Sequence, residues 1–147
     1  MKMTIFYFTG TGNSLSVAKK IGGEDVKLIS IPQVIDSRTN HYKDDVIGLV
    51  FPVYYYSTPA MVRRFLKKVK LEADYTFVIS THGGGAGAAL WHAQKFARLK
   101  FDYAADVRMV SNYLPMGSIE DEIKIASGFD SKDKIESIVS DIAGRKQ

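Results

Sequence analysis

The segment Thr9-Gly10-Thr11-Gly12-Asn13-Ser14 lies between an apolar run, residues 3–8, and a run of helical composition, residues 15–21. The apolar run is typical of a buried strand. The start of a helix has unpaired backbone N–H groups and the positive end of the helix dipole, which together favour an anion. Gly10 and Gly12 let the backbone approach a ligand closely. Because the segment also holds four polar side chains and neither Lys nor Arg, it predicts a phosphate site made of neutral donors.

Two better-known phosphate loops do not match this segment. The Walker A loop is excluded because no Gly-Lys-Ser/Thr follows, and the dinucleotide fingerprint is excluded because Leu15 occupies the place of its third glycine. A plain helix start, capped by Asn13 or Ser14, is the simpler alternative. One capping residue would be enough for that, so the four polar side chains and two glycines favour a phosphate site.

The hexamer resembles the FMN-phosphate loop of flavodoxins, whose pattern is Thr/Ser-x-Thr-Gly-Asn-Thr/Ser, and it meets every position of that pattern. The resemblance implies that FMN binds non-covalently, with its phosphate at Thr9, Gly10, Thr11, Gly12, Asn13 and Ser14. It extends over nearly the whole chain. The segment Met109-Val110-Ser111-Asn112-Tyr113 is similar to Met-Pro-x-Asn-Tyr in the flavodoxin part of flavodoxin–ferredoxin fusion proteins, although Val110 replaces the proline. The sequence assigns no role to Asn112 or Tyr113.

Composition predicts one globular domain, residues 1–147. Hydrophobic residues make up 46% and charged residues 24%, which is usual for a soluble protein. The absence of cysteine excludes a disulfide scaffold and cysteine-ligated clusters. No apolar run approaches the ~20 residues of a membrane span, and no signal peptide is recognised. We therefore expect a cytoplasmic protein without a membrane or metal site.

The formal net charge is +4, whereas flavodoxins are commonly acidic. A basic balance can steer acidic partners toward the protein. We expect redox protein partners, acidic ones among them. Nucleic acid is not expected because the chain has no long basic run, and the oligomeric state does not follow from the sequence.

Apolar runs and helical periodicities alternate along the chain, which predicts an α/β fold. Strands are expected at residues 2–8, 25–29, 46–51, 75–79 and 104–110, and helices at 14–21, 59–70, 88–99 and 130–143. The alternation indicates a three-layer α/β/α sandwich with a five-stranded parallel sheet. The resemblance implies the flavodoxin-like order 2-1-3-4-5, in which ligands bind beyond the C-terminal ends of the strands.

The segment after the third strand holds three consecutive tyrosines and is expected to contact the flavin ring. Its residues are Pro52, Val53, Tyr54, Tyr55 and Tyr56. Exposed aromatic rings need an apolar partner, and stacking on another ring system supplies one. The resemblance implies stacking by Tyr54 and Tyr55, with Tyr56 as a third candidate. At least one of the three rings is expected to pack on the protein or at an oligomer contact instead.

The segment after the fourth strand is rich in glycine. The residues expected to bind the cofactor here are Thr81, His82, Gly83, Gly84, Gly85 and Gly87. The glycine N–H groups are expected to meet the pyrimidine carbonyls. His82 has three possible roles: covering the second face of the ring, bonding to the pyrimidine edge, or a purely structural one.

Two further features of the helices carry expectations. Trp91 is expected in the core, and His41 and His92 are expected in solvent. The polar face of the helix that Pro59 begins is either a solvated face or a docking patch for an acidic partner. Its cations are Arg63, Arg64, Lys67, Lys68 and Lys70.

The function predicted from these features is that of an electron-transfer protein that carries FMN. No acid–base pair or nucleophile is recognised, so the chain is more consistent with a carrier than with an enzyme. Two alternatives remain open: an FMN-dependent NAD(P)H:quinone-type reductase, and a flavin-free interaction domain of the same fold. A receiver domain is excluded because residues 9–14 hold no carboxylate.

Overall fold

The structure is a computed structural model that describes residues 2–9, 13–53, 59–82, 89–108 and 131–147. Strands and helices alternate along the chain, as the sequence predicts. Their order is β1 (Met3–Tyr7), α1 (Asn13–Gly22), β2 (Val26–Ser30), α2 (Ile31–Val34), β3 (His41–Pro52), α3 (Ala60–Lys68), β4 (Lys70–His82), α4 (Ala89–Ala97), β5 (Tyr103–Arg108) and α6 (Ser131–Ala143).

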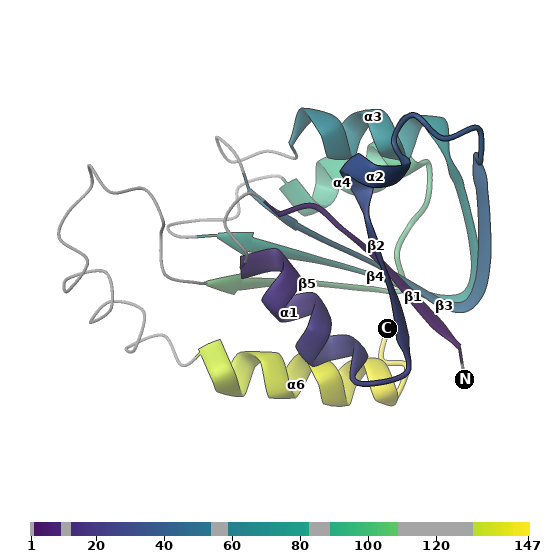
Figure 1. Cartoon of the computed structure of the whole chain (residues 1–147). Coiled ribbons are helices and arrows are strands. Elements are labelled where there is room, and N and C mark those ends of the chain that lie inside the picture. Colours follow the sequence, from purple (N-terminus) through teal and green to yellow (C-terminus); the bar gives the residue numbers. More distant parts are fainter. Residues whose placement is uncertain (1, 10–12, 54–58, 83–88, 109–130) are drawn as a thin grey trace, which may run out of the picture.

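The strands form one five-stranded parallel sheet in the order β2-β1-β3-β4-β5. This confirms the predicted order and places β2 at an edge. Because all strands run in one direction, their C-terminal ends meet at the same edge of the sheet, and α1, α3 and α4 begin there (Figure 1). This edge is where a ligand is expected in a doubly wound sheet.

Two hydrophobic cores lie on the two faces of the sheet, which gives the three layers. On one face, α1 and α6 pack through residues such as Val17, Ile21 and Ile138. On the other face, α2, α3 and α4 pack through residues such as Ile31 and Phe65. Figure 1 shows these two groups of helices on opposite sides of the sheet. The central strands are therefore buried on both faces, which explains why β3 contains a continuous apolar run.

Strands β3 and β4 are longer than predicted. They begin at His41 and Lys70 and pair with each other from those two residues onward. The N-terminal part of β3 alternates exposed and half-buried residues and carries several charges, so its sequence lacks the apolar run of a buried strand. The predicted helix that extended to Lys70 was too long, because α3 ends at Lys68.

Glycine at position 48 makes room for an aromatic ring in the centre of the sheet. Gly48 pairs with Phe77 on the neighbouring strand. A Cβ atom at position 48 would lie 2.0 Å from the ring atom Cζ of Phe77. Phe77 is fully buried, so its ring has little space into which to move.

The prediction that Trp91 belongs to the core was wrong. Its side chain is 60% exposed, although it lies in α4, which packs on the sheet. The buried face of this helix is formed by Ala93, with Leu90 and Phe96 packed against the core. Trp91 projects from another face of the helix and contacts Lys95 and His92.

Candidate functional site

Thr81 connects the ends of three elements at the C-terminal edge of the sheet. Its hydroxyl oxygen lies 3.1 Å from that of Ser14 at the start of α1, and its carbonyl accepts a hydrogen bond of 2.8 Å from the N–H of Val53. Both hydroxyl-bearing residues are buried, Ser14 with 1% and Thr81 with 2% of its surface exposed. The structure therefore brings the described ends of the three predicted flavin-binding segments together.

The first of these segments begins directly after β1. The N–H of Phe8 donates to the carbonyl of Val50, which continues the pairing of β1 with β3 up to the residue before Thr9. The helix α1 then starts at Asn13. Strand β1 ends at Tyr7 and α1 begins at Asn13, so the N-terminus of α1 lies at the sheet edge, as an anion site at a helix start requires.

His82 is the last residue of β4 and is paired with an aspartate of the neighbouring strand. Its Nε2 lies 2.7 Å from Oδ2 of Asp106, and only 9% of its side chain is exposed, against 49% for Asp106. A carboxylate on one ring nitrogen fixes the orientation of an imidazole and favours a proton on that nitrogen. When the ring is neutral, Nδ1 is then a hydrogen-bond acceptor.

Two buried polar atoms at this edge have no hydrogen-bond partner among the described residues. They are Nδ1 of His82 and the hydroxyl oxygen of Ser80. Ser80 and His82 lie two positions apart on β4, so both side chains are on the face covered by α3 and α4. Buried polar atoms in folded proteins are nearly always hydrogen bonded. These two atoms therefore lack the partner that a buried polar atom normally has.

Many of the predicted site residues lie outside the described residues. They are Gly10, Thr11, Gly12, Tyr54, Tyr55, Tyr56, Gly83, Gly84, Gly85 and Gly87. The predicted roles of these residues stay predictions. The described members of the site are Thr9, Asn13, Ser14, Pro52, Val53, Thr81 and His82, and all of them lie at or next to the same sheet edge.

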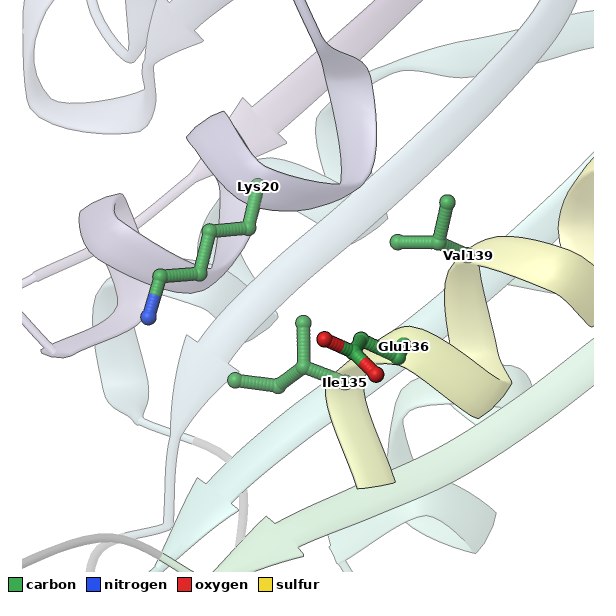
Figure 2. Close-up of a pocket in the computed structure, with 4 residues that line it drawn as sticks. All are labelled: Lys20, Ile135, Glu136 and Val139. Atoms are coloured by element: carbon green, nitrogen blue, oxygen red, sulfur yellow. The ribbon is translucent and has the colours of Figure 1, made fainter. Parts of the chain in front are cut away.

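A separate groove lies between α1 and α6, on the face of the sheet opposite to α3 and α4. It is lined by Lys20, Ile135, Glu136 and Val139. Figure 2 shows Lys20 on α1 and the other three on α6. None of the predicted flavin-binding residues lines this groove, so it is not part of the candidate site.

Neither of the other two histidines belongs to the site. His41 is exposed, as predicted, and lies 2.8 Å from Glu72. His92 was also expected in solvent, but it is half-buried next to Trp91 and Phe96 on α4. In the described part of the chain, no group of three or more His, Asp or Glu side chains is arranged to hold a metal ion, and no helix there has the length and hydropathy needed to cross a membrane.

No protein-family profile matches the sequence, and no curated protein matches it either. Solved structures do match the fold. A putative flavoprotein from Bacteroides uniformis aligns with a TM-score of 0.59 and 15% identity, over 84% of this chain and 97% of its own. Two-electron reduced flavodoxin from Megasphaera elsdenii aligns with a TM-score of 0.55 and 18% identity, over 86% of this chain and 98% of the flavodoxin. The chain has the flavodoxin-like fold.

A third matching structure contains FMN. It is a flavoprotein from Lactobacillus acidophilus in complex with FMN, with a TM-score of 0.52 and 17% identity, over 86% of this chain and 98% of that protein. The resemblance to flavodoxins that the sequence shows is thus confirmed at the level of the fold. At such identities the likeness carries the arrangement of strands and helices, and function is a separate question.

The sequence did not predict two contacts of this candidate site. Asp106 was not recognised as the partner of His82, and Ser14 and Thr81 were each assigned to a ligand and not to one another. The register of β4 with β5 places Asp106 opposite Ser80 and Arg108 opposite His82. An aspartate near the end of β5 was therefore the available signal, but it can be used only when the register is known.

Proposed function

We propose that this chain is an electron-transfer protein that binds FMN non-covalently at the C-terminal edge of its sheet. The observation that carries the proposal is the hydrogen bonding of Thr81 to both Ser14 and Val53. These hydrogen bonds join the described ends of three segments. The residues of the first segment, which ends at Ser14, suit the phosphate of FMN, those around Val53 suit its ring, and those that follow Thr81 suit its pyrimidine edge. The complex of another flavodoxin-like protein with FMN supports this choice of cofactor.

The residues at this edge fit FMN by their chemistry. The phosphate would be held by residues 9–14, through hydroxyl and backbone donors and the N-terminus of α1. The ring would lie between the tyrosine segment that follows Val53 and the glycine segment that follows His82. The polar atoms without partners on Ser80 and His82 suit a ligand that has hydrogen-bonding groups along one edge. Bound FMN supplies the redox chemistry, and the protein supplies binding, orientation and electrostatics.

The described side chains have positioning roles in this proposal. The buried hydroxyl pair of Ser14 and Thr81 holds the start of α1 against the end of β4, and so fixes the distance between the phosphate site and the ring site. Asp106 holds the imidazole of His82 in one orientation. His82 would then present Nδ1 toward the pyrimidine edge, which was one of its three predicted roles.

Spectroscopy of the purified full chain with added FMN tests the proposal. We expect the absorbance bands of FMN to shift on binding, and the bound flavin to take up electrons in two separable steps during anaerobic titration with dithionite. A redox protein should then reoxidise it. Rapid oxidation of NADH or NADPH by the loaded protein would favour the reductase instead, and unchanged FMN bands would favour the flavin-free interaction domain.

A further inference from the structure

Helices α3 and α4 present a surface in which cations lie over aromatic rings. Arg63 and Lys67 of α3 lie 5.9 and 5.0 Å from the ring centre of Phe96, and Lys95 lies 5.3 Å from that of Trp91. We call these five residues the α3–α4 surface. We propose that it is the docking site for an acidic redox protein, an inference that rests on the proposed electron-transfer function.

The charge of this surface is of one sign. Neither α3 nor α4 contains an aspartate or glutamate. Two other cations of α3 are used within the fold, since Arg64 pairs with Asp36 at 2.7 Å and Lys68 donates to backbone carbonyls. Among the ion pairs of the described residues, none includes Arg63, Lys67 or Lys95. These three cations are therefore available to carboxylates of another protein.

Trp91 gives the surface an apolar anchor. It is the only large hydrophobic side chain that is strongly exposed in the described part of the chain. Lys95 and His92 contact its ring within the same helix, so the ring loses little conformational freedom when a partner covers it. Tryptophan and arginine are the residue types most enriched where protein interfaces have their strongest contacts.

The place of the surface suits electron transfer. Helices α3 and α4 lie side by side on one face of the sheet, and both begin at the edge where β3 and β4 end (Figure 1). Trp91 is in the first turn of α4 and Arg63 is in the first turn of α3. A protein docked here would contact the rim of the proposed flavin site, so a redox centre near its own surface would face the flavin.

The chemistry favours an acidic protein over other occupants. A second copy of this chain would present the same positive charge and be repelled. Tight binding of nucleic acid needs many phosphate contacts along an extended basic track, whereas here a compact group of cations surrounds one exposed ring. Complementary charge around an aromatic anchor instead speeds and orients the encounter of two proteins.

Trp91 is the only tryptophan of the chain, so its fluorescence reports on this surface alone. The probe is a 2Fe–2S ferredoxin with an acidic surface, titrated into the full-length protein with and without added FMN. We expect the emission of Trp91 to change saturably in about 0.01 M salt, and the affinity to fall at least tenfold in about 1 M salt, where the Debye length shortens from about 30 to about 3 Å.

A matched pair of charge reversals locates the binding site. The variant Lys67→Glu/Lys95→Glu should bind the ferredoxin about tenfold or more weakly. The control Lys27→Glu/Lys134→Glu changes the net charge equally at exposed positions of β2 and α6, and should bind within about twofold of the parent. Circular dichroism of both variants should match that of the parent.

Three outcomes would overturn the proposal. They are an unchanged Trp91 emission with ferredoxin, an equal loss of affinity in the two variants, and tighter binding of a single-stranded oligonucleotide than of ferredoxin. The parallel titration with FMN keeps the two proposals apart. If ferredoxin binds but FMN does not, the proposed electron-carrier function is contradicted and the docking surface stands. If FMN binds but ferredoxin does not, only the docking surface is contradicted.

Discussion

Ser14 and Thr81 form a buried hydroxyl pair whose contribution to stability can be measured by a double-mutant cycle. The two oxygens are 3.1 Å apart, and the residues are 1% and 2% exposed. Ser14→Ala or Thr81→Val removes one hydroxyl and leaves the other buried without this partner. Such a change costs about 1–3 kcal/mol, whereas removing both hydroxyls together avoids the penalty of an unsatisfied group.

The assay is urea unfolding of the parent, both single variants and the double variant, without FMN. We expect each single variant to lose about 1–3 kcal/mol of unfolding free energy, and the double variant to lose less than the sum by about 1 kcal/mol. Ser16→Ala on the same helix is the control for the higher helix propensity of alanine, and it should change stability by less than about 0.5 kcal/mol. Strictly additive losses would show that the two hydroxyls do not interact.

Two further predictions concern the core. Gly48→Ala should destabilise the fold by about 3 kcal/mol or more, because its Cβ would lie 2.0 Å from the ring of Phe77. Adding Phe77→Leu to this variant should restore part of the lost stability, measured by urea unfolding. If it restored none, the clash with Phe77 would not be the cause. Burial and the hydrogen bond to Asp141 raise the pKa of Tyr103. The stability from this shift is fully present below about pH 10 and lost as the pH rises further, so Tyr103→Phe should lose less stability than the parent between about pH 9 and 11. If the parent and Tyr103→Phe lost the same stability over this pH range, Tyr103 would not be the source of the alkaline loss.

The general fold could be predicted because its signals are local. The apolar run of β3 indicates a strand buried on both faces. Gly23 ends α1 with a φ of +70°, the conformation that glycine favours just after a helix. The alternation of such strands with amphipathic helices leaves few topologies, and the observed order is one of the two common ones.

What could not be predicted depends on contacts between distant residues. Ser14 and Thr81 are 67 positions apart, and no periodicity links them. Trp91 was assigned to the core because it lies inside a predicted helix, but α4 buries Ala93 on its sheet-facing side and leaves the larger ring outside. The first residues of β3 alternate between exposed and half-buried, and none of the first residues of β4 is fully buried. Both stretches belong to the sheet because each strand pairs with the other. Tertiary pairing decided these features.

Phosphate binding at the start of α1 is the claim on which the proposed function depends. It is decided by titrating the flavin-free protein with FMN and with riboflavin, which differ only in the phosphate. Two hydrogen bonds to a charged group contribute about 3 kcal/mol or more, so FMN should bind about 100-fold or more tightly than riboflavin. Equal affinities for the two flavins would contradict a phosphate site between β1 and α1.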